Sequence, residues 1–504
     1  MNDRNNTPRV SIVSRRSIAV AVSAACIFVA SLAGASVQAS AYTPQTDPYS
    51  MYNTTTIMGA RAWWSAGYTG QGVDVALIDS GVAPVQGLDA SGKVLYGPDL
   101  SFESQSSAYR NLDTYGHGTF MAGLIAGSDG GAGANPPADS YQGVAPGARI
   151  VSLKVATADG GTDVSQVIAA IDWVVQHRHD PGMNIRVLSL SYGTNSAQAY
   201  GVDPLAFAAE RAWKAGIVVV ASAGNTGYQK SKGAPGLADP AYDPYIIGVG
   251  GYDTRGTAAS SDDVIGAYSA SSAVCAGRCK NPDFVAVGSH LQGLRVPGSF
   301  IDQTHPEGLL GDRYFRGSGT SQAAAVTAGA VALILQKYPT LTPDQVKRFI
   351  ADNGRKVPGY DSRAQGGGEI NLVKLAARSP QAHIQKFTDA TGTGSLEAAR
   401  GSDHLTMNGM ALTGSQDIFG HAFDAAAMAT AESGGQSWTD GVWNGNTWTG
   451  GPWTGPSWTG AAWSDSVWSS NTWDGRSWSG IAWTGTSWSG RSWTGRSWSG
   501  GSWQ

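Results

Sequence analysis

Three side chains that together could perform nucleophilic catalysis occupy distinctive positions in the chain. Asp79 follows an apolar run and precedes Ser80-Gly81, His117 stands between two glycines, and Ser321 opens an apolar helical pattern. Taken singly, each has a structural explanation, as a turn former, a structural imidazole and a helix cap. Taken together, they supply what a serine hydroxyl needs to attack a carbonyl carbon: a base that takes its proton and a third group that orients this base.

The elements that must position these residues alternate between strands and helices. Short apolar runs typical of buried strands occur at 73–78, 149–155, 185–190 and 217–221. Between them, 164–175 carries one apolar helical face and 204–215 forms a second helical pattern. This alternation predicts an α/β fold with a parallel sheet, in which chemistry gathers at the carboxyl ends of the strands. Asp79 lies at such an end.

Short motifs surround the three residues and occur between them. They are Val75–Gly81, His117–Gly123, Gly143–Pro146, Ser189–Gly193, Ala221–Asn225, Pro282–Gly288 and Gly319–Ser321. In this order, between about residues 57 and 377, they make the chain similar to the subtilisin-like serine peptidases, the subtilase family. The resemblance implies a subtilisin-like parallel sheet flanked by helices.

The resemblance also implies a role for each candidate residue. Ser321 would be the nucleophile, His117 the general base and then acid, and Asp79 the group that orients the imidazole. The order Asp, His, Ser is that of subtilisin and differs from that of chymotrypsin-like enzymes. Asn225 matches the family's oxyanion-hole asparagine, which would act with the backbone N–H of Ser321. We therefore expect a serine endopeptidase that works through an acyl-enzyme and requires no cofactor for catalysis.

Two segments match the family's substrate-binding strand and its first specificity pocket. Main-chain pairing with an extended substrate tolerates many side chains, so we expect broad specificity for protein and peptide substrates. Tyr192 would line a neighbouring apolar pocket, with an ordinary packed aromatic as the alternative. Gln322 departs from the family, whose members commonly carry Met after the serine. The residues assigned to substrate binding are Ser191, Tyr192, Gly193, Ser222, Ala223 and Gly224.

Residues 1–41 have the layout of a signal peptide. A basic segment precedes an apolar run at 18–34, and small residues follow at 39–41. We expect a secreted protein, extracellular or associated with the cell surface, and Ser14-Arg15-Arg16 leaves open ordinary or twin-arginine export. The stretch from residue 42 to Asp79 is too short for the family's usual inhibitory propeptide. We therefore expect folding to be assisted otherwise, with the C-terminal segments as candidates.

Composition and cysteine content exclude several other classes of protein. Charged residues make up only 14% of the 504 residues and the formal net charge is −4, so we expect no nucleic-acid partner. Cys275 and Cys279, four apart, are candidates for a short-loop disulfide, with two free thiols as the alternative. Zinc needs more ligands than these. The family often uses structural calcium, for which the sequence identifies no ligands.

The C-terminal part divides into two segments. Residues 379–436 are rich in Gly, Ala, Ser and Thr and weakly periodic, which predicts a linker or small irregular module. From Trp438 to Trp503 a Trp recurs at every fifth position, a period that fits neither a strand nor a helix. Regular aromatics suit stacking on sugars, so one hypothesis is binding of cell-wall glycan; another is a self-associating or tethering extension. The predicted segments are a signal peptide (1–41), a peptidase domain (42–378), the linker (379–436) and a Trp-rich repeat (437–504).

Two alternatives to a monomeric secreted peptidase stay open. Gly319-Thr-Ser321-Gln-Ala323 nearly matches the nucleophile elbow of α/β-hydrolases, which need an Asp and a His after the serine. The histidines available there, at 383, 404 and 421, fall in the weakly patterned linker, which argues against this scheme. The second alternative is a surface- or glycan-binding protein that uses the Trp repeat and keeps an inactive peptidase-like scaffold. The presence of Asn225 and of the whole Asp, His and Ser set argues against inactivity.

Overall fold

The computed structural model describes residues 42–105, 109–130, 135–227, 236–272, 279–402, 404–407, 410–418, 420–447 and 468–469. All of them belong to one unit that begins at Tyr42. The predicted signal peptide, Cys275 and most of the Trp repeat lie outside the described residues.

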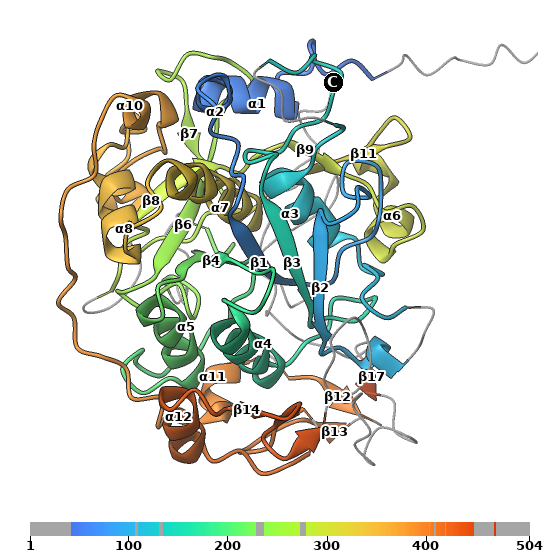
Figure 1. Ribbon diagram of the computed structural model, residues 1–504, viewed down its shortest axis with the longest axis vertical. Helices are drawn as coiled ribbons and strands as arrows, with labels where there is room; N and C mark the ends of the chain where they lie inside the picture. Colours follow the sequence, from blue (N-terminus) through green and yellow to red (C-terminus); the bar gives the residue numbers. More distant parts are fainter. Residues whose placement is uncertain are drawn as a thin grey trace, which may run out of the picture. The chain divides into compact units, whose positions relative to one another are not determined.

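A mainly parallel sheet forms the centre of this unit (Figure 1). Its strands are β1 (Asp74–Asp79), β2 (Val94–Asp99), β3 (Arg149–Lys154), β4 (Ile185–Leu190), β5 (Val218–Ser222), β6 (Ile247–Asp253), β7 (Val264–Ile265) and β8 (Phe284–Val287). The order is β2-β3-β1-β4-β5-β6-β7, with β8 also paired to β6. Only β7 runs antiparallel to its neighbour among these pairings. The predicted parallel sheet is confirmed, and the four predicted strands correspond to β1, β3, β4 and β5.

Helices cover both faces of the sheet (Figure 1). On one face, α3 (His117–Ala126) and α7 (Thr320–Lys337) pack against each other. On the other face, α4 (Val164–His177) packs against α5 (Pro204–Lys214). The predicted helical patterns at 164–175 and 204–215 are therefore α4 and α5, and the predicted α/β fold flanked by helices is confirmed.

The starts of α4 and α5 follow from local sequence. The carboxylate of Asp163 accepts a hydrogen bond from the first turn of α4, and the Gln166 side chain completes a capping box. The carboxylate of Asp203 accepts hydrogen bonds from the first turn of α5, and Pro204 occupies the first helical position. Both helices therefore begin at a defined residue.

Shorter elements surround the central sheet. An antiparallel sheet of order β10-β11-β9 is formed by β9 (Leu291–Leu294), β10 (Leu309–Leu310) and β11 (Tyr314–Gly317). The short helices are α1 (Met51–Met58), α2 (Ala60–Ser65), η1 (Phe102–Gln105), α6 (Phe300–Thr304), η3 (Pro306–Gly308), α8 (Pro343–Asp352), α9 (Ser362–Gln365) and α10 (Leu372–Ala376).

The described residues between 379 and 447, which we call the C-terminal belt, include the elements that pack over α4 and α5 (Figure 1). α12 contacts α5, α11 contacts both helices, and β14 contacts α4. Beyond the belt, β17 (Trp468–Ser469) pairs with β12. The belt contains α11 (Leu396–Arg400), β12 (Thr406–Met407), β13 (Met410–Ala411), α12 (Ala425–Ser433), β14 (Trp438–Thr439), β15 (Val442–Trp443) and β16 (Asn446–Thr447). The segment predicted as a linker or small irregular module thus lies against the helices of the sheet.

A buried ion pair and two tryptophans attach the belt to α4. Arg400 Nε lies 2.6 Å from Oδ1 of Asp163, and both side chains are almost fully buried. The indole N–H of Trp438 donates to the Ala169 carbonyl oxygen at 2.8 Å, and a second indole N–H, that of Trp443, donates to a carboxylate on α4 at the same distance. The first two tryptophans of the repeat are therefore buried against the sheet's helices.

The pairing of β14 with β15 explains why Trp438 and Trp443 are five residues apart. β14, β15 and β16 form an antiparallel ladder in which Trp438 lies directly opposite Trp443. The turns between the strands are Asp440-Gly441 and Asn444-Gly445, and all four residues have positive φ. Asp-Gly and Asn-Gly favour the tight turns that join antiparallel strands. The first two-residue turn therefore places Trp438 opposite Trp443, whereas across the second turn Trp443 lies opposite Asn446.

Candidate active site

The carboxylate of Asp79 and the imidazole of His117 are in direct contact. Asp79 ends β1, and His117 is the first residue of α3. His117 Nδ1 lies 2.7 Å from Asp79 Oδ1, and both side chains are buried. A neutral imidazole that donates its Nδ1 proton to this oxygen presents Nε2 as its acceptor nitrogen. This arrangement orients an imidazole to act as a general base.

Ser80 and Asp113 support this contact. The backbone N–H of Ser80 donates to Asp79 Oδ1 at 2.7 Å, and its hydroxyl lies 2.8 Å from Asp113 Oδ1. Asp113 in turn accepts from the backbone N–H groups of Gly116 and Thr119, each at 2.7 Å. It therefore caps α3, whose N-cap glycine has no side chain to do so. The only local signal for this role in the sequence is an acidic residue shortly before a helix start.

Ser321 lies in the first turn of α7, at the carboxyl ends of β4 and β5. It is fully buried. Its carbonyl oxygen lies 3.5 Å from the hydroxyl of Ser191, which follows β4. Thr320, the preceding residue, contacts Asn225, which lies just beyond β5. Because β1, β4 and β5 are neighbours in the sheet, the predicted nucleophile and the Asp79–His117 pair lie at the same edge.

The amide of Asn225 is oriented by Thr320. Asn225 Oδ1 accepts from both the backbone N–H and the hydroxyl of Thr320, each at 3.0 Å. The amide nitrogen Nδ2 is buried and has no hydrogen-bond partner among the described residues. A buried donor without a partner is costly, so its presence at the start of α7 calls for an acceptor supplied by another molecule. The sequence carries no local signal for this role of Thr320.

The residues predicted to bind substrate lie in two adjacent segments. Ser191, Tyr192 and Gly193 follow β4, and the Tyr192 side chain is packed in the hydrophobic core with 1% of its surface exposed. Gly193 backs onto Ala238, since a Cβ at Gly193 would lie 2.8 Å from the Ala238 Cβ. A side chain at position 193 would therefore collide with the segment that contains Ala238.

The second predicted segment runs from the end of β5 toward Asn225. Ser222 is the last residue of β5, and the backbone N–H of Ala223 donates to the Val249 carbonyl oxygen at 2.9 Å. Gly224 has a φ of 101°, a conformation that favours glycine, and its N–H donates to the Thr320 hydroxyl at 3.2 Å. Thr320 therefore joins this segment to the start of α7.

Gln322, the residue that departs from the family pattern, is fully buried behind Ser321. Neither its amide oxygen nor its amide nitrogen has a hydrogen-bond partner among the described residues. A Cβ at Gly317 would lie 2.8 Å from its amide nitrogen. The glutamine is thus accommodated next to a glycine that leaves it space.

Within the described ranges, no group of three or more His, Cys, Asp or Glu side chains is placed to hold a metal ion. No helix in that part of the chain combines the length and apolar character needed to cross a bilayer. Cys279 is disulfide-bonded. Its predicted partner, Cys275, lies outside the described residues, so the pairing stays a prediction.

A sequence model of the subtilase family, Peptidase S8, matches residues 70–368. The chain belongs to the subtilase family. Among relatives of this subtilase, the serine protease AprX of Bacillus subtilis is 36% identical over 307 residues, which are 60% of this chain and 66% of AprX. Subtilisin DY of Bacillus licheniformis is 33% identical over 310 residues, 62% of this chain and 93% of that protein. The chain thus spans slightly less than two thirds of AprX and nearly all of subtilisin DY.

A solved structure shares the fold of this subtilase. Fervidolysin from Fervidobacterium pennivorans, described as a keratinolytic enzyme related to subtilisin, matches with a TM-score of 0.50 and 23% identity. The match covers 65% of this chain and 45% of fervidolysin. At this identity the likeness supports the fold alone.

Proposed function

We propose that this subtilase is a serine endopeptidase in which Ser321, His117 and Asp79 act as the catalytic triad. The observation that carries the proposal is the 2.7 Å contact between His117 Nδ1 and Asp79 Oδ1 at the carboxyl end of β1. The position of Ser321 at the start of α7, beside the buried amide of Asn225, supports it. Relatives named as serine proteases support the same chemistry.

The first half of the proposed reaction forms an acyl-enzyme. Ser321 Oγ attacks the carbonyl carbon of the scissile peptide bond while its proton passes to Nε2 of His117. The carbonyl oxygen becomes an oxyanion, which accepts hydrogen bonds from Asn225 Nδ2 and from the backbone N–H of Ser321. The C–N bond then breaks, and His117 gives its proton to the leaving amine.

The second half releases the new carboxyl terminus. A water molecule attacks the ester on Ser321 while His117 takes one of its protons, and the tetrahedral intermediate forms on the same oxyanion donors. The C–O bond to Ser321 breaks, and the serine recovers its proton from His117. Every step uses side chains and backbone groups of this chain, so no cofactor takes part.

We further propose broad specificity for unfolded protein substrates. The segment from Ser191 to Gly193 matches the family's substrate-binding strand, and main-chain pairing with an extended peptide tolerates many side chains. Incubating the full-length protein with a denatured protein mixture and identifying the new termini tests this. Cleavage after many residue types supports the proposal, and cleavage after a single residue type would contradict broad specificity. No new termini at all would contradict the endopeptidase itself.

Replacing Asn225 with Leu is expected to lower kcat by about 10²- to 10³-fold with little change in KM, because the lost donor acts on the oxyanion. This magnitude is that of the equivalent asparagine in subtilisin, a relative of this chain. Asn353→Leu, at the end of α8, is the matched control with an expected wild-type kcat. A kcat for Asn225→Leu equal to that of the control would rule out the oxyanion role.

Replacing Gly118 with Ala is expected to lower kcat by at least about 10²-fold. The added Cβ would lie 2.1 Å from the Gly81 carbonyl oxygen, so α3 must shift and carry His117 away from Asp79. A displacement of about 1 Å costs about this much in rate. Gly201→Ala is the control, since a Cβ there meets nothing within 4 Å. Steady-state kinetics on one substrate compares them, and equal kcat values would show that this contact does not set the position of His117.

We propose that the enzyme acts outside the cell as a monomer. The basic and apolar sequence of residues 1–41 supports export, and one relative, 29% identical over 313 residues, is named a minor extracellular protease of Bacillus subtilis. Glycan binding by the Trp repeat stays a hypothesis. Most residues of the repeat lie outside the described ranges. Retention of the isolated repeat on cell-wall polysaccharide tests it, and no retention would exclude it.

A further inference from the structure

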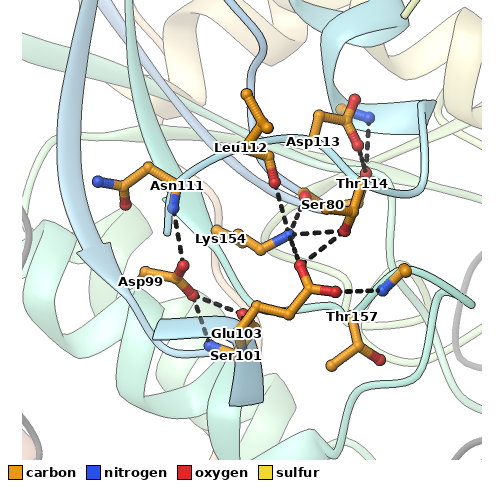
Figure 2. Close-up of polar contacts among 12 residues, drawn as sticks. Ser80, Asp99, Ser101, Glu103, Asn111, Leu112, Asp113, Thr114, Lys154 and Thr157 are labelled. Atoms are coloured by element: carbon orange, nitrogen blue, oxygen red, sulfur yellow. Dashed lines mark hydrogen bonds and ion pairs between the residues drawn. The ribbon is translucent and has the colours of Figure 1, made fainter. Parts of the chain in front are cut away.

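The buried ammonium group of Lys154 connects several segments of the chain (Figure 2). Lys154 ends β3 and lies opposite Asp79 in the parallel register of β1 and β3. Its Nζ donates to the carbonyl oxygens of Ser80 and Leu112, each at 2.8 Å. No part of the side chain is exposed. A buried charge is costly without partners, so these acceptors are what keep the ammonium group in place.

Glu103 supplies the counter-charge (Figure 2). Its Oε2 lies 3.0 Å from Lys154 Nζ and accepts a hydrogen bond from the Thr114 hydroxyl at 2.6 Å. Its Oε1 accepts from the backbone N–H of Ala158 at 2.9 Å, in the segment that follows β3. The ion pair therefore links η1, the loop before α3 and the segment after β3.

The acceptors of Lys154 lie on the two segments that carry the Asp79–His117 pair. Ser80 directly follows Asp79, and Leu112 directly precedes Asp113, whose carboxylate caps α3. The Ser80 hydroxyl joins the two segments through its 2.8 Å bond to Asp113. Lys154 therefore holds the end of β1 against the loop that enters α3.

Several carboxylates surround this ammonium group. Burial raises the pKa of Asp99 and of Asp113, while the charge of Lys154 lowers both. Lys154 therefore offsets negative charge close to the imidazole, and Glu103 offsets part of the charge of Lys154. The titratable groups that neighbour the ion pair from other elements are Asp79, Asp99, Asp113 and Asp159, and Tyr115 interacts with three of these carboxylates.

We propose that Lys154 and Glu103 are a positioning pair for the reaction: they hold Asp79 and His117 in contact, and their charges set the electrostatic potential at the imidazole. The inference rests on the proposed function, because it concerns the general base of that reaction. A nearby positive charge disfavours a protonated imidazole, and a nearby negative charge favours it. Removing the two charges one at a time therefore acts in opposite directions on the protonation of the base.

The pH profile of kcat/KM for the full-length protein tests this, because its acidic limb reports the essential base of the free enzyme. Lys154→Met is expected to move this limb to higher pH by about half a pH unit, and Glu103→Gln to move it to lower pH by a similar amount. The double variant returns the limb toward the wild-type position. Lys154→Met also lowers kcat by about tenfold to 10²-fold, because the imidazole is less well held.

Lys93 provides the matched control. It is partly buried, and its Nζ donates to the carbonyl oxygens of Pro146 and Ala148 at 2.6 and 2.9 Å. It precedes β2, at the opposite end of the strands from Asp79. Lys93→Met is therefore expected to keep the wild-type pH profile, whatever it does to stability.

Limbs that do not move in either charge variant, or that move in the same direction, overturn the inference. If Lys154→Met does not fold, Glu103→Gln alone decides, and an unmoved limb in that variant overturns the inference. In each of these cases an active wild type leaves the proposed function standing. A wild type without peptidase activity contradicts the proposed function instead.

Discussion

Replacing Ser321 with Ala is expected to lower kcat on an unfolded protein substrate by about 10⁶-fold, a magnitude known for the equivalent serine of subtilisin, a relative of this chain. The hydroxyl is the only group in the proposed mechanism that forms a covalent bond to substrate, and the imidazole has no function without it. His117→Ala is therefore expected to cost about as much, and the double variant no more than either single one.

The matched control is Ser395→Ala. Ser395 caps α11, where its hydroxyl accepts a hydrogen bond from the Ala398 backbone N–H. If Ser321 had only a structural role in the first turn of α7, both variants would keep their activity. A wild-type kcat for Ser321→Ala would thus show that Ser321 is not the nucleophile.

Ending the chain after Arg378 is expected to leave a protein that does not fold stably. The shortened chain loses Arg400, the partner of Asp163 in a buried ion pair at the start of α4. It also loses the indoles of Trp438 and Trp443, each of which buries about 150–250 Å² at roughly 25 cal/mol per Å², so the loss is a large share of a typical folding free energy of about 5–15 kcal/mol. Removing Trp438 and Trp443 also exposes the apolar surface of α4 that they cover. Chemical denaturation followed by circular dichroism measures the loss.

A pair of single variants separates the ion pair from the rest of the belt. Arg400→Met is expected to lower the free energy of unfolding by about 3–5 kcal/mol. Arg348→Met breaks an exposed ion pair with Asp352 on α8 and is expected to cost less than about 1 kcal/mol. A shortened chain that folds and cleaves as well as the full-length protein would show that the belt is dispensable. It would also remove the belt as a candidate for assisting folding.

The parts of the fold that sequence predicts well are those with a strong local signal. The apolar run before Asp79 is β1, and the apolar periodicity of 164–175 is α4. By contrast, β2 contains Gly97-Pro98, residues that disfavour strands, and the sequence did not indicate it. Its pairing with β3 overrides the local preference, because tertiary hydrogen bonds decide where propensity is weak.

The residues that hold the candidate site in place have no comparable local signal in the sequence. Lys154 ends an apolar strand and becomes a neighbour of Asp79 only through the register between β1 and β3. The same holds for Thr320, whose contact with Asn225 joins residues far apart in sequence. Only the assembled sheet brings such groups together, so motifs identify the residues of the proposed reaction and miss those that hold them in place.

The belt illustrates a third case, in which weak periodicity conceals packed structure. Its strands have two residues each, and α11 has five, too few for a helical or alternating pattern to emerge. Asp440-Gly441 and Asn444-Gly445 were a usable signal, because such pairs mark tight turns between antiparallel strands. The turn at Asp440-Gly441 accounts for the five-residue spacing between the first two tryptophans of the repeat.

The proposed triad is tested most directly by locating the adduct of a fluorophosphonate probe, which reacts with an activated serine hydroxyl. The full-length protein is treated with the probe, digested, and its peptides are mapped by mass spectrometry. The triad of Asp79, His117 and Ser321 predicts one modified residue, Ser321, and no modification of that peptide when His117 is replaced with Ala. An unmodified wild-type protein, or an adduct on a different serine, would contradict it.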